Sequence, residues 1–155
     1  MPLPTSLKRK LIQNLPETAY KEAAVLPSSE IGTLFTIQGG PIMVTSLMGR
    51  VTTAISGTQT ISININPTNS AARDMASVLT ITNDLVHNIY KLNATFGSPL
   101  VVSTQLGGEE VGNPPFFISE GIITVTSTAT DTTGLVEWYL TWYALHPAAG
   151  VRAGA

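Results

Sequence analysis

The chain has 155 residues, a formal net charge of −2 and only 12% charged residues, about half the share usual in globular proteins. Its length predicts one domain that can bury a core, and the absence of cysteine excludes disulfides and thiolate chemistry. The low charge indicates a surface of uncharged polar residues or one covered by partners. We expect no signal peptide and no membrane helix, since no apolar run approaches the ~20 residues that a span needs.

The first 30 residues differ in composition from the rest of the chain. They hold seven of the eighteen charges and prolines at positions 2, 4, 16 and 27. Pro16 interrupts the only segment with helical character. We therefore predict an extended N-terminal arm over residues 1–30, which lies on another surface rather than folding alone.

From Gly32 onward the sequence consists of short stretches of period two, which is the spacing of a β-strand. The stretch with Ile61, Ile63 and Ile65 alternates most clearly with polar residues, and Gly49 is interpreted as a bulge or bend in its strand. A hairpin is predicted over residues 116–145 with its turn at 131–134, followed by a flexible tail over 147–155. The other predicted strands cover residues 32–38, 42–56, 77–82, 85–92 and 98–105.

These elements predict an all-β fold. Eight or nine short strands separated by Gly, Pro, Asn and Asp, without a sustained helical period, favour a β-sandwich domain over residues 31–146. Few turns are tight enough for a simple meander, so we expect crossings between opposite sheets, as in a jelly roll. An immunoglobulin-like sandwich and a small barrel remain alternatives.

The last predicted strand presents two different faces. Trp138, Leu140 and Trp142 share the apolar face, which we assign to the core. The other face is half polar and carries Glu137, Tyr139, Thr141, Tyr143 and Leu145. Tyrosine is favoured at interfaces because it buries a large area while its hydroxyl keeps a hydrogen bond. A second subunit is expected to cover this face; the alternative is that a single subunit buries both faces.

The sequence offers little for catalysis. His87 and His146 are isolated from other candidate ligands, so no metal site is predicted. Glu109 and Glu110 lie in a Gly-rich loop typical of a solvated tip, and nucleophile and phosphate-binding motifs are missing. The basic run Lys8–Lys10 would give only weak, salt-sensitive contact with nucleic acid. We therefore expect no enzyme activity, no cofactor and no nucleic-acid partner.

Three segments together resemble the capsid decoration, or cement, proteins of tailed bacteriophages: "GTLFTIQGGPIMVTSLMGRVTTAI", "SVLTITNDLVHNIYKL" and "GIITVTSTATDTTGLVEWYLTWYAL". The resemblance covers residues 31–146. It rests on the residue pattern of the segments and on their order in the chain, not on a catalytic motif. It implies a homotrimeric β-sandwich on the outer surface of the virion, assembled in the cytoplasm of the host bacterium. There it would clamp neighbouring capsomers of the major capsid protein.

These expectations name two sets of contact residues and one competing class of function. The expected subunit interface consists of Tyr139, Thr141, Tyr143 and Leu145, and the expected capsid contacts of the arm are Leu7, Lys8, Arg9, Lys10, Leu11 and Tyr20. No membrane or small-molecule substrate is expected. The alternatives are a tail or head-fibre component and a carbohydrate- or receptor-binding module. A sugar binder should gather aromatic residues at one end, whereas the phenylalanines are predicted mostly within or beside strands.

Overall fold

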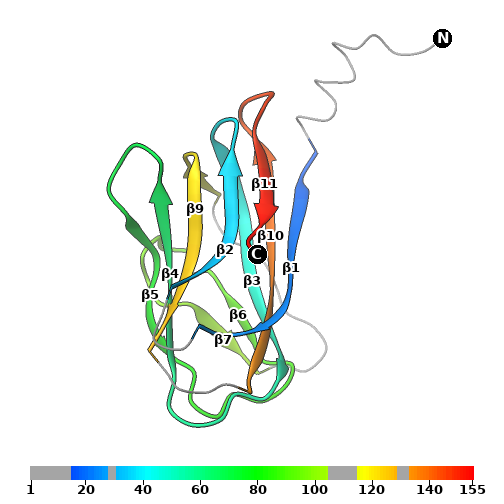
Figure 1. Cartoon of the computed structure of the whole chain (residues 1–155), viewed down its shortest axis with the longest axis vertical. Coiled ribbons are helices and arrows are strands. Elements are labelled where there is room, and N and C mark those ends of the chain that lie inside the picture. The colour runs from blue at the N-terminus through cyan, green and yellow to red at the C-terminus, as the bar shows by residue number, and fades with distance from the viewer. Residues whose placement is uncertain (1–14, 28–30, 105–114, 129–132) are drawn as a thin grey trace, which may run out of the picture.

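The computed structural model describes residues 15–27, 31–104, 115–128 and 133–155. In these ranges the chain forms eleven β-strands, which make two antiparallel sheets packed face to face (Figure 1). The predicted all-β sandwich is confirmed. No helix long and apolar enough to cross a membrane is found among the described residues.

The two sheets are called sheet A and sheet B. Sheet A contains, in spatial order, β1 (Glu17–Val25), β10 (Leu135–Ala144), β3 (Ile42–Thr53), β6 (Ile89–Lys91) and β7 (Val101–Ser103), with β8 (Phe116–Ile118) also paired to β3. Sheet B contains β11 (Gly150–Ala153), β2 (Ile31–Gln38), β9 (Gly121–Ser127), β4 (Thr60–Pro67) and β5 (Arg73–Thr80). Among the described strands only β4–β5 and β6–β7 are both consecutive and paired. The chain therefore crosses repeatedly between sheets, as a jelly-roll-like fold requires.

The core lies between the two sheets. It includes the apolar side chains that the sequence predicted to be buried on the last strand and on the strand with three alternating isoleucines. From sheet A, Trp138 and Trp142 are only 2% and 3% exposed. From sheet B, Ile61, Ile63 and Ile65 are also buried. Burying a large apolar side chain contributes about 1.5–3 kcal/mol. The face assignment of the last strand is thus confirmed.

Gly49 lies in a regular part of its strand, not in a bulge, and its missing side chain leaves space for an aromatic ring. It pairs in regular register with Trp138 on one side and with Tyr90 on the other. A Cβ at this position would lie 2.8 Å from Cζ3 of Trp138. The irregularities in the pairing of β3 with β10 lie elsewhere, between Leu135 and Val136 and between Thr141 and Trp142. The bulge interpretation is therefore wrong, and the glycine is needed because the indole packs against its backbone.

Parts of the predicted extended arm and of the predicted flexible tail are strands that pair with the sandwich. In the second half of the predicted arm, β1 pairs with β10 from Glu17 opposite Trp142 to Val25 opposite Leu135. In the predicted tail, β11 pairs with β2, with Ala153 opposite Phe35. Residues 17–25 and 150–153 are therefore parts of the sandwich, because each completes a sheet edge that would otherwise expose backbone groups.

Three strand predictions are corrected. The hairpin over residues 116–145 is wrong, because β9 belongs to sheet B and β10 to sheet A, so these strands are not paired with each other. The strand expected at residues 77–82 already begins at Arg73. The strands expected at 85–92 and 98–105 shrink to β6 and β7, three residues each.

The segment before β6 is a loop because its backbone turns into the left-handed region. Asn83 and His87 have φ angles of 57° and 73°, which a strand does not tolerate. The hydroxyl of buried Tyr90 donates to Oδ2 of Asp84 over 2.7 Å and ties this loop to β6. Burial, and then this hydrogen bond, raise the pKa of Tyr90 well above its usual range.

Candidate interaction surface

The side of sheet A that faces away from the core is the candidate functional surface, here called the outer face. All described strands belong to the two sheets, so no described strand packs over it (Figure 1). Its members alternate with the inward-facing residues of β1, β10 and β3. They are Thr18, Tyr20, Glu137, Tyr139, Thr141, Tyr143, Met43, Ser46, Met48 and Arg50.

A buried carboxylate organises the middle of the outer face. Glu137 on β10 is only 5% exposed. Its Oε2 accepts a hydrogen bond from the hydroxyl of Tyr20 on β1 at 3.1 Å. Its Oε1 accepts from the hydroxyl of Tyr139 at 2.9 Å and from Nε of Arg50 on β3 at 2.5 Å. These four residues, the Glu137 cluster, connect three neighbouring strands.

Hydrogen bonding sets the ionisation of the Glu137 cluster. Burial acts to raise the pKa of Glu137, but the hydrogen bonds from Tyr139, Arg50 and Tyr20 outweigh it and hold that pKa below its usual value. Burial first, and then the hydrogen bond to Glu137, raise the pKa of Tyr139. The same hydrogen-bonding partner raises the pKa of Arg50. At neutral pH the cluster therefore contains a carboxylate, a guanidinium and two neutral phenols.

Three of the four expected interface residues share the outer face. Tyr139, Thr141 and Tyr143 project from β10 and are half-buried. The hydroxyl of Thr141 lies 3.4 Å from that of Thr18 on β1. Leu145 lies just beyond the end of β10 and is 43% exposed. The outer face thus keeps a surface of tyrosine and threonine side chains that the described chain covers only in part.

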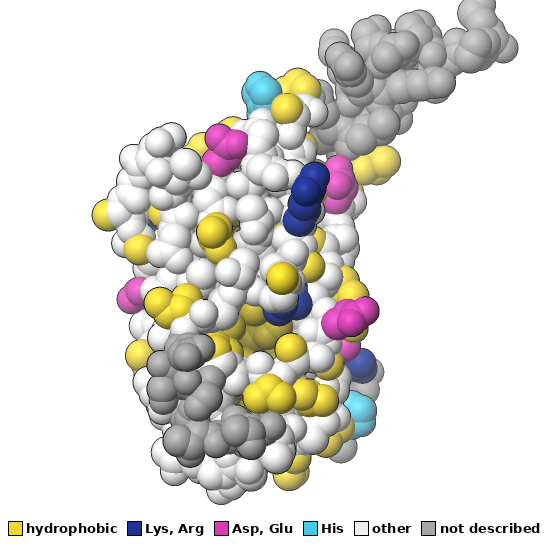
Figure 2. All heavy atoms as spheres, viewed as in Figure 1, with side chains coloured by type: hydrophobic (Ala, Val, Ile, Leu, Met, Phe, Trp, Pro, Cys, Tyr) yellow, Lys and Arg dark blue, Asp and Glu magenta, His cyan; other side chains and the backbone are white. Residues whose placement is uncertain are grey.

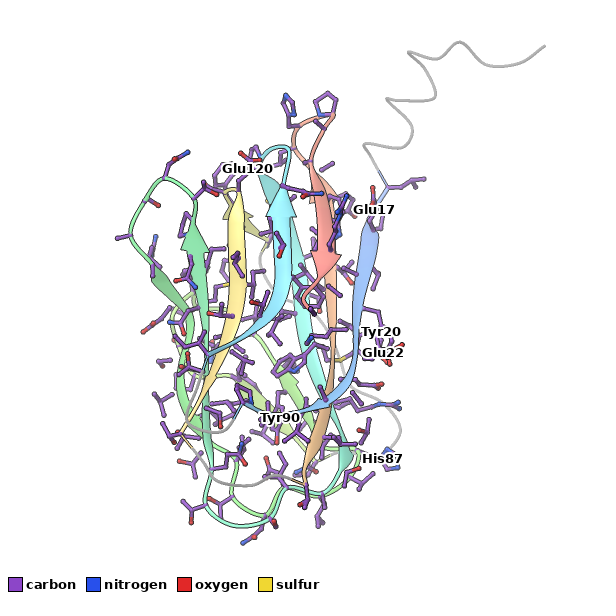
Figure 3. The ribbon with its side chains drawn as sticks, viewed as in Figure 1. Glu17, Tyr20, Glu22, His87, Tyr90 and Glu120 are labelled. Atoms are coloured by element: carbon purple, nitrogen blue, oxygen red, sulfur yellow. The ribbon has the colours of Figure 1, made fainter. Side chains whose placement is uncertain are left out.

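Tyr20 lies in a paired strand rather than in a free arm. It was predicted to contact a capsid through a free arm, but it lies on β1 with its ring centroid 5.1 Å from that of Tyr139. Figure 3 shows Tyr20 projecting from the outer edge of the sandwich, where it is 46% exposed. β1 therefore extends the half-polar face by one strand, and Tyr20 contacts Tyr139 on it. The other expected arm contacts, Leu7, Lys8, Arg9, Lys10 and Leu11, lie outside the described residues.

The opposite surface, on sheet B, has another character. Figure 2 shows mostly backbone and uncharged polar side chains, with hydrophobic patches between them and few, scattered charges. Several of these groups bind one another: Nδ2 of Asn64 donates to Asp74 over 2.6 Å, and Nδ2 of Asn66 donates to Thr124 over 3.2 Å. The low charge of the chain thus corresponds in part to a polar surface that satisfies its own hydrogen bonds.

Sequence reasoning missed Arg50 and the partners of Glu137. The available signal was Glu137 itself, a lone carboxylate in an otherwise apolar and aromatic strand, which requires a cation or several donors when it is buried. In the part of the chain that the structure describes, no group of three potential metal ligands comes together. Compared with models of known families, with curated proteins and with solved structures, the chain shows no match.

Proposed function

We propose that the chain is a structural protein of a tailed-bacteriophage virion. In this role it decorates the capsid and stabilises it by holding neighbouring capsomers of the major capsid protein together. The observation that carries the proposal is the outer face of sheet A, where tyrosine, threonine and methionine side chains lie on three adjacent strands around the Glu137 cluster. The resemblance of residues 31–146 to decoration proteins supports the same role.

The chemistry of the outer face suits contact between proteins. Interfaces are enriched in tyrosine, methionine and arginine, and the outer face contains all three types. The Glu137 cluster fixes Tyr20 and Tyr139 in place, so little side-chain entropy remains to be lost on association. In the proposed homotrimer, Tyr139, Thr141 and Tyr143 would contact the neighbouring copy.

The expected capsid contacts of the arm precede β1 in the sequence. Residues 1–14 lead into β1, which forms the edge of sheet A next to β10. They contain the basic run Lys8–Lys10 flanked by Leu7 and Leu11. Leucine and basic side chains together suit an acidic and apolar groove on a neighbouring capsomer.

Particles that lack the protein provide the test. Purified chain is added to such particles, and bound copies are located by electron microscopy. The proposal predicts density on the outer capsid surface at positions of threefold symmetry and particles that resist heating better. Tyr143→Ser should reduce occupancy, whereas Val78→Ala, at an exposed site on sheet B, should not. Density on the tail alone, or no binding, would contradict the proposal.

A further inference from the structure

A groove lies at one end of the sandwich, away from the Glu137 cluster. It consists of two adjoining hollows of about 340 and 190 Å³. The larger volume falls in the range of ligand pockets, roughly 300–1,000 Å³. Pro67, Ser70, Phe117 and Ser119 line both hollows, so the two form one continuous feature, here called the end groove.

Phe117 lies at the centre of the end groove and lines both of its hollows. It is the middle residue of β8, whose alternation buries Ile118 and turns Phe117 outward. Phe117 is 62% exposed, although its neighbour Phe116 packs against the core. An aromatic ring exposed between two hollows offers a flat apolar surface to a ligand on either side.

Polar groups surround this ring in the larger hollow. Glu120 is held in place because its Oε1 accepts a hydrogen bond from the backbone N–H of Gly39 at 2.5 Å. Figure 3 shows Glu120 at this end of the sandwich, near the top of the view. Asn69 and Ser70, from the loop between β4 and β5, complete the polar side. Together these groups supply both hydrogen-bond donors and acceptors.

A fixed cation lies in the smaller hollow. The guanidinium carbon of Arg73 lies 5.0 Å from the ring centroid of Phe96, and this ring packs edge-on against Phe116 with centroids 5.1 Å apart. Phe96, Phe116 and Phe117 thus meet at one end of the sandwich although they come from separate segments. Phe116 and Phe117 lie in a strand, as expected, but together with Phe96 they also form an aromatic group at one end of the sandwich, which the sequence did not indicate.

We propose that the end groove binds a neutral oligosaccharide, with one pyranose ring stacked on Phe117. A pyranose presents an apolar face of C–H groups and a rim of hydroxyls that donate and accept hydrogen bonds. Phe117 matches the apolar face, and Glu120, Asn69 and Arg73 match the rim. The one carboxylate and one guanidinium of the lining balance each other, which favours a neutral ligand over a charged one. Phe117 pairs with Met43 of the outer face, so the end groove adjoins the proposed capsid contact, but the sugar titration uses the free chain and tests the groove alone.

The test is a titration of the isotope-labelled full chain with maltotriose, cellotriose and triacetylchitotriose at millimolar concentrations, followed by nuclear magnetic resonance. At least one of these sugars should cause saturable shifts confined to amides around residues 67–70 and 117–120. Phe117→Ala should weaken that binding at least about tenfold, and Phe117→Tyr should retain it. Leu85→Ala is the matched control, because Leu85 is 68% exposed on a different loop.

Two results would overturn the proposal. The first is the absence of shifts at these amides with all three sugars; if a proline-rich peptide then shifts the same amides, the groove is a peptide site. The second is unchanged sugar affinity in Phe117→Ala, with the fold of the variant verified by its thermal melting. Attachment to capsids, measured separately, does not affect either outcome.

Discussion

Tyr20 and Tyr139 lie side by side on neighbouring strands, with ring centroids 5.1 Å apart, and both hydroxyls donate to the carboxylate of Glu137. The two tyrosines are far apart in the sequence, so this contact fastens the N-terminal strand β1 to the centre of sheet A. Arg50 completes the cluster from the other side of β10. The Glu137 cluster therefore both fixes the edge of the sandwich and shapes the surface proposed to bind partners.

Removing the carboxylate should weaken the fold. Glu137→Ala removes the acceptor that Arg50, Tyr20 and Tyr139 share. Arg50 and Tyr20 are exposed and can bond to water instead, so the expected cost is that of about one net hydrogen bond, about 0.5–1.5 kcal/mol. The free energy of unfolding, measured with urea, should fall by about that amount. Asp74→Ala is the control: Asp74 also accepts a hydrogen bond, from Asn64, but is exposed, so its loss should cost less than about 0.5 kcal/mol. Equal losses in the two variants would rule out a special role for Glu137.

The same cluster predicts a dependence on acid. The pKa of Glu137 is lower in the folded state than its ordinary value of about 4.5. Its contribution is therefore present above that value and is lost as the pH falls through the lower, folded-state pKa. Urea unfolding of the wild type and of Glu137→Gln between pH 7 and pH 3 should show a stability difference that shrinks on acidification, below roughly pH 4.5. A difference that stays constant over this range would contradict the linkage.

Gly49 should not tolerate a methyl group. An added Cβ would lie 2.8 Å from the ring of Trp138, and overpacking of this kind costs about 1–3 kcal/mol. Gly49→Ala should lower the melting temperature accordingly. Gly150 is a matched control, because it also lies in a strand but a Cβ there meets no atom within 4 Å. Gly150→Ala should leave the melting temperature nearly unchanged; a similar loss in both variants would show that glycine flexibility, not the contact with Trp138, matters.

The core could be predicted from sequence because period two identifies which side of a strand is buried. Ile61, Ile63 and Ile65 on β4 and Trp138 on β10 are buried as expected. The same pattern does not say which strands are neighbours. For this reason the hairpin over 116–145 was wrong: β9 and β10 follow each other in sequence but pair in different sheets.

The edge strands and the site were harder to predict for a different reason. β1 is mostly exposed and β11 has only four residues, so neither shows a clear apolar alternation. Their stability comes from pairing with β10 and β2, partners more than 100 residues away in the chain. The Glu137 cluster likewise depends on the register that brings Tyr20 and Arg50 beside Glu137. A lone carboxylate in the sequence indicates a partner without identifying it.

Two truncations separate the part of the N-terminal segment that folds from the part proposed to bind. Deleting residues 1–25 removes β1, exposes the edge of β10 and takes Tyr20 from the Glu137 cluster. This variant should melt at a clearly lower temperature. Deleting only residues 1–14 leaves the whole of β1, so the melting temperature should stay unchanged.

Binding to particles should respond differently from folding. Without residues 1–14 the chain loses Leu7, the basic run Lys8–Lys10 and Leu11, and its attachment to particles should weaken. The loss should resemble the effect of added salt on the full chain, because salt screens the contribution of exposed charges. Sedimentation of particles with each variant over a range of salt concentrations measures this. If the chain without residues 1–14 binds as tightly as the full chain, the outer face alone carries the attachment and the arm does not contact the capsid.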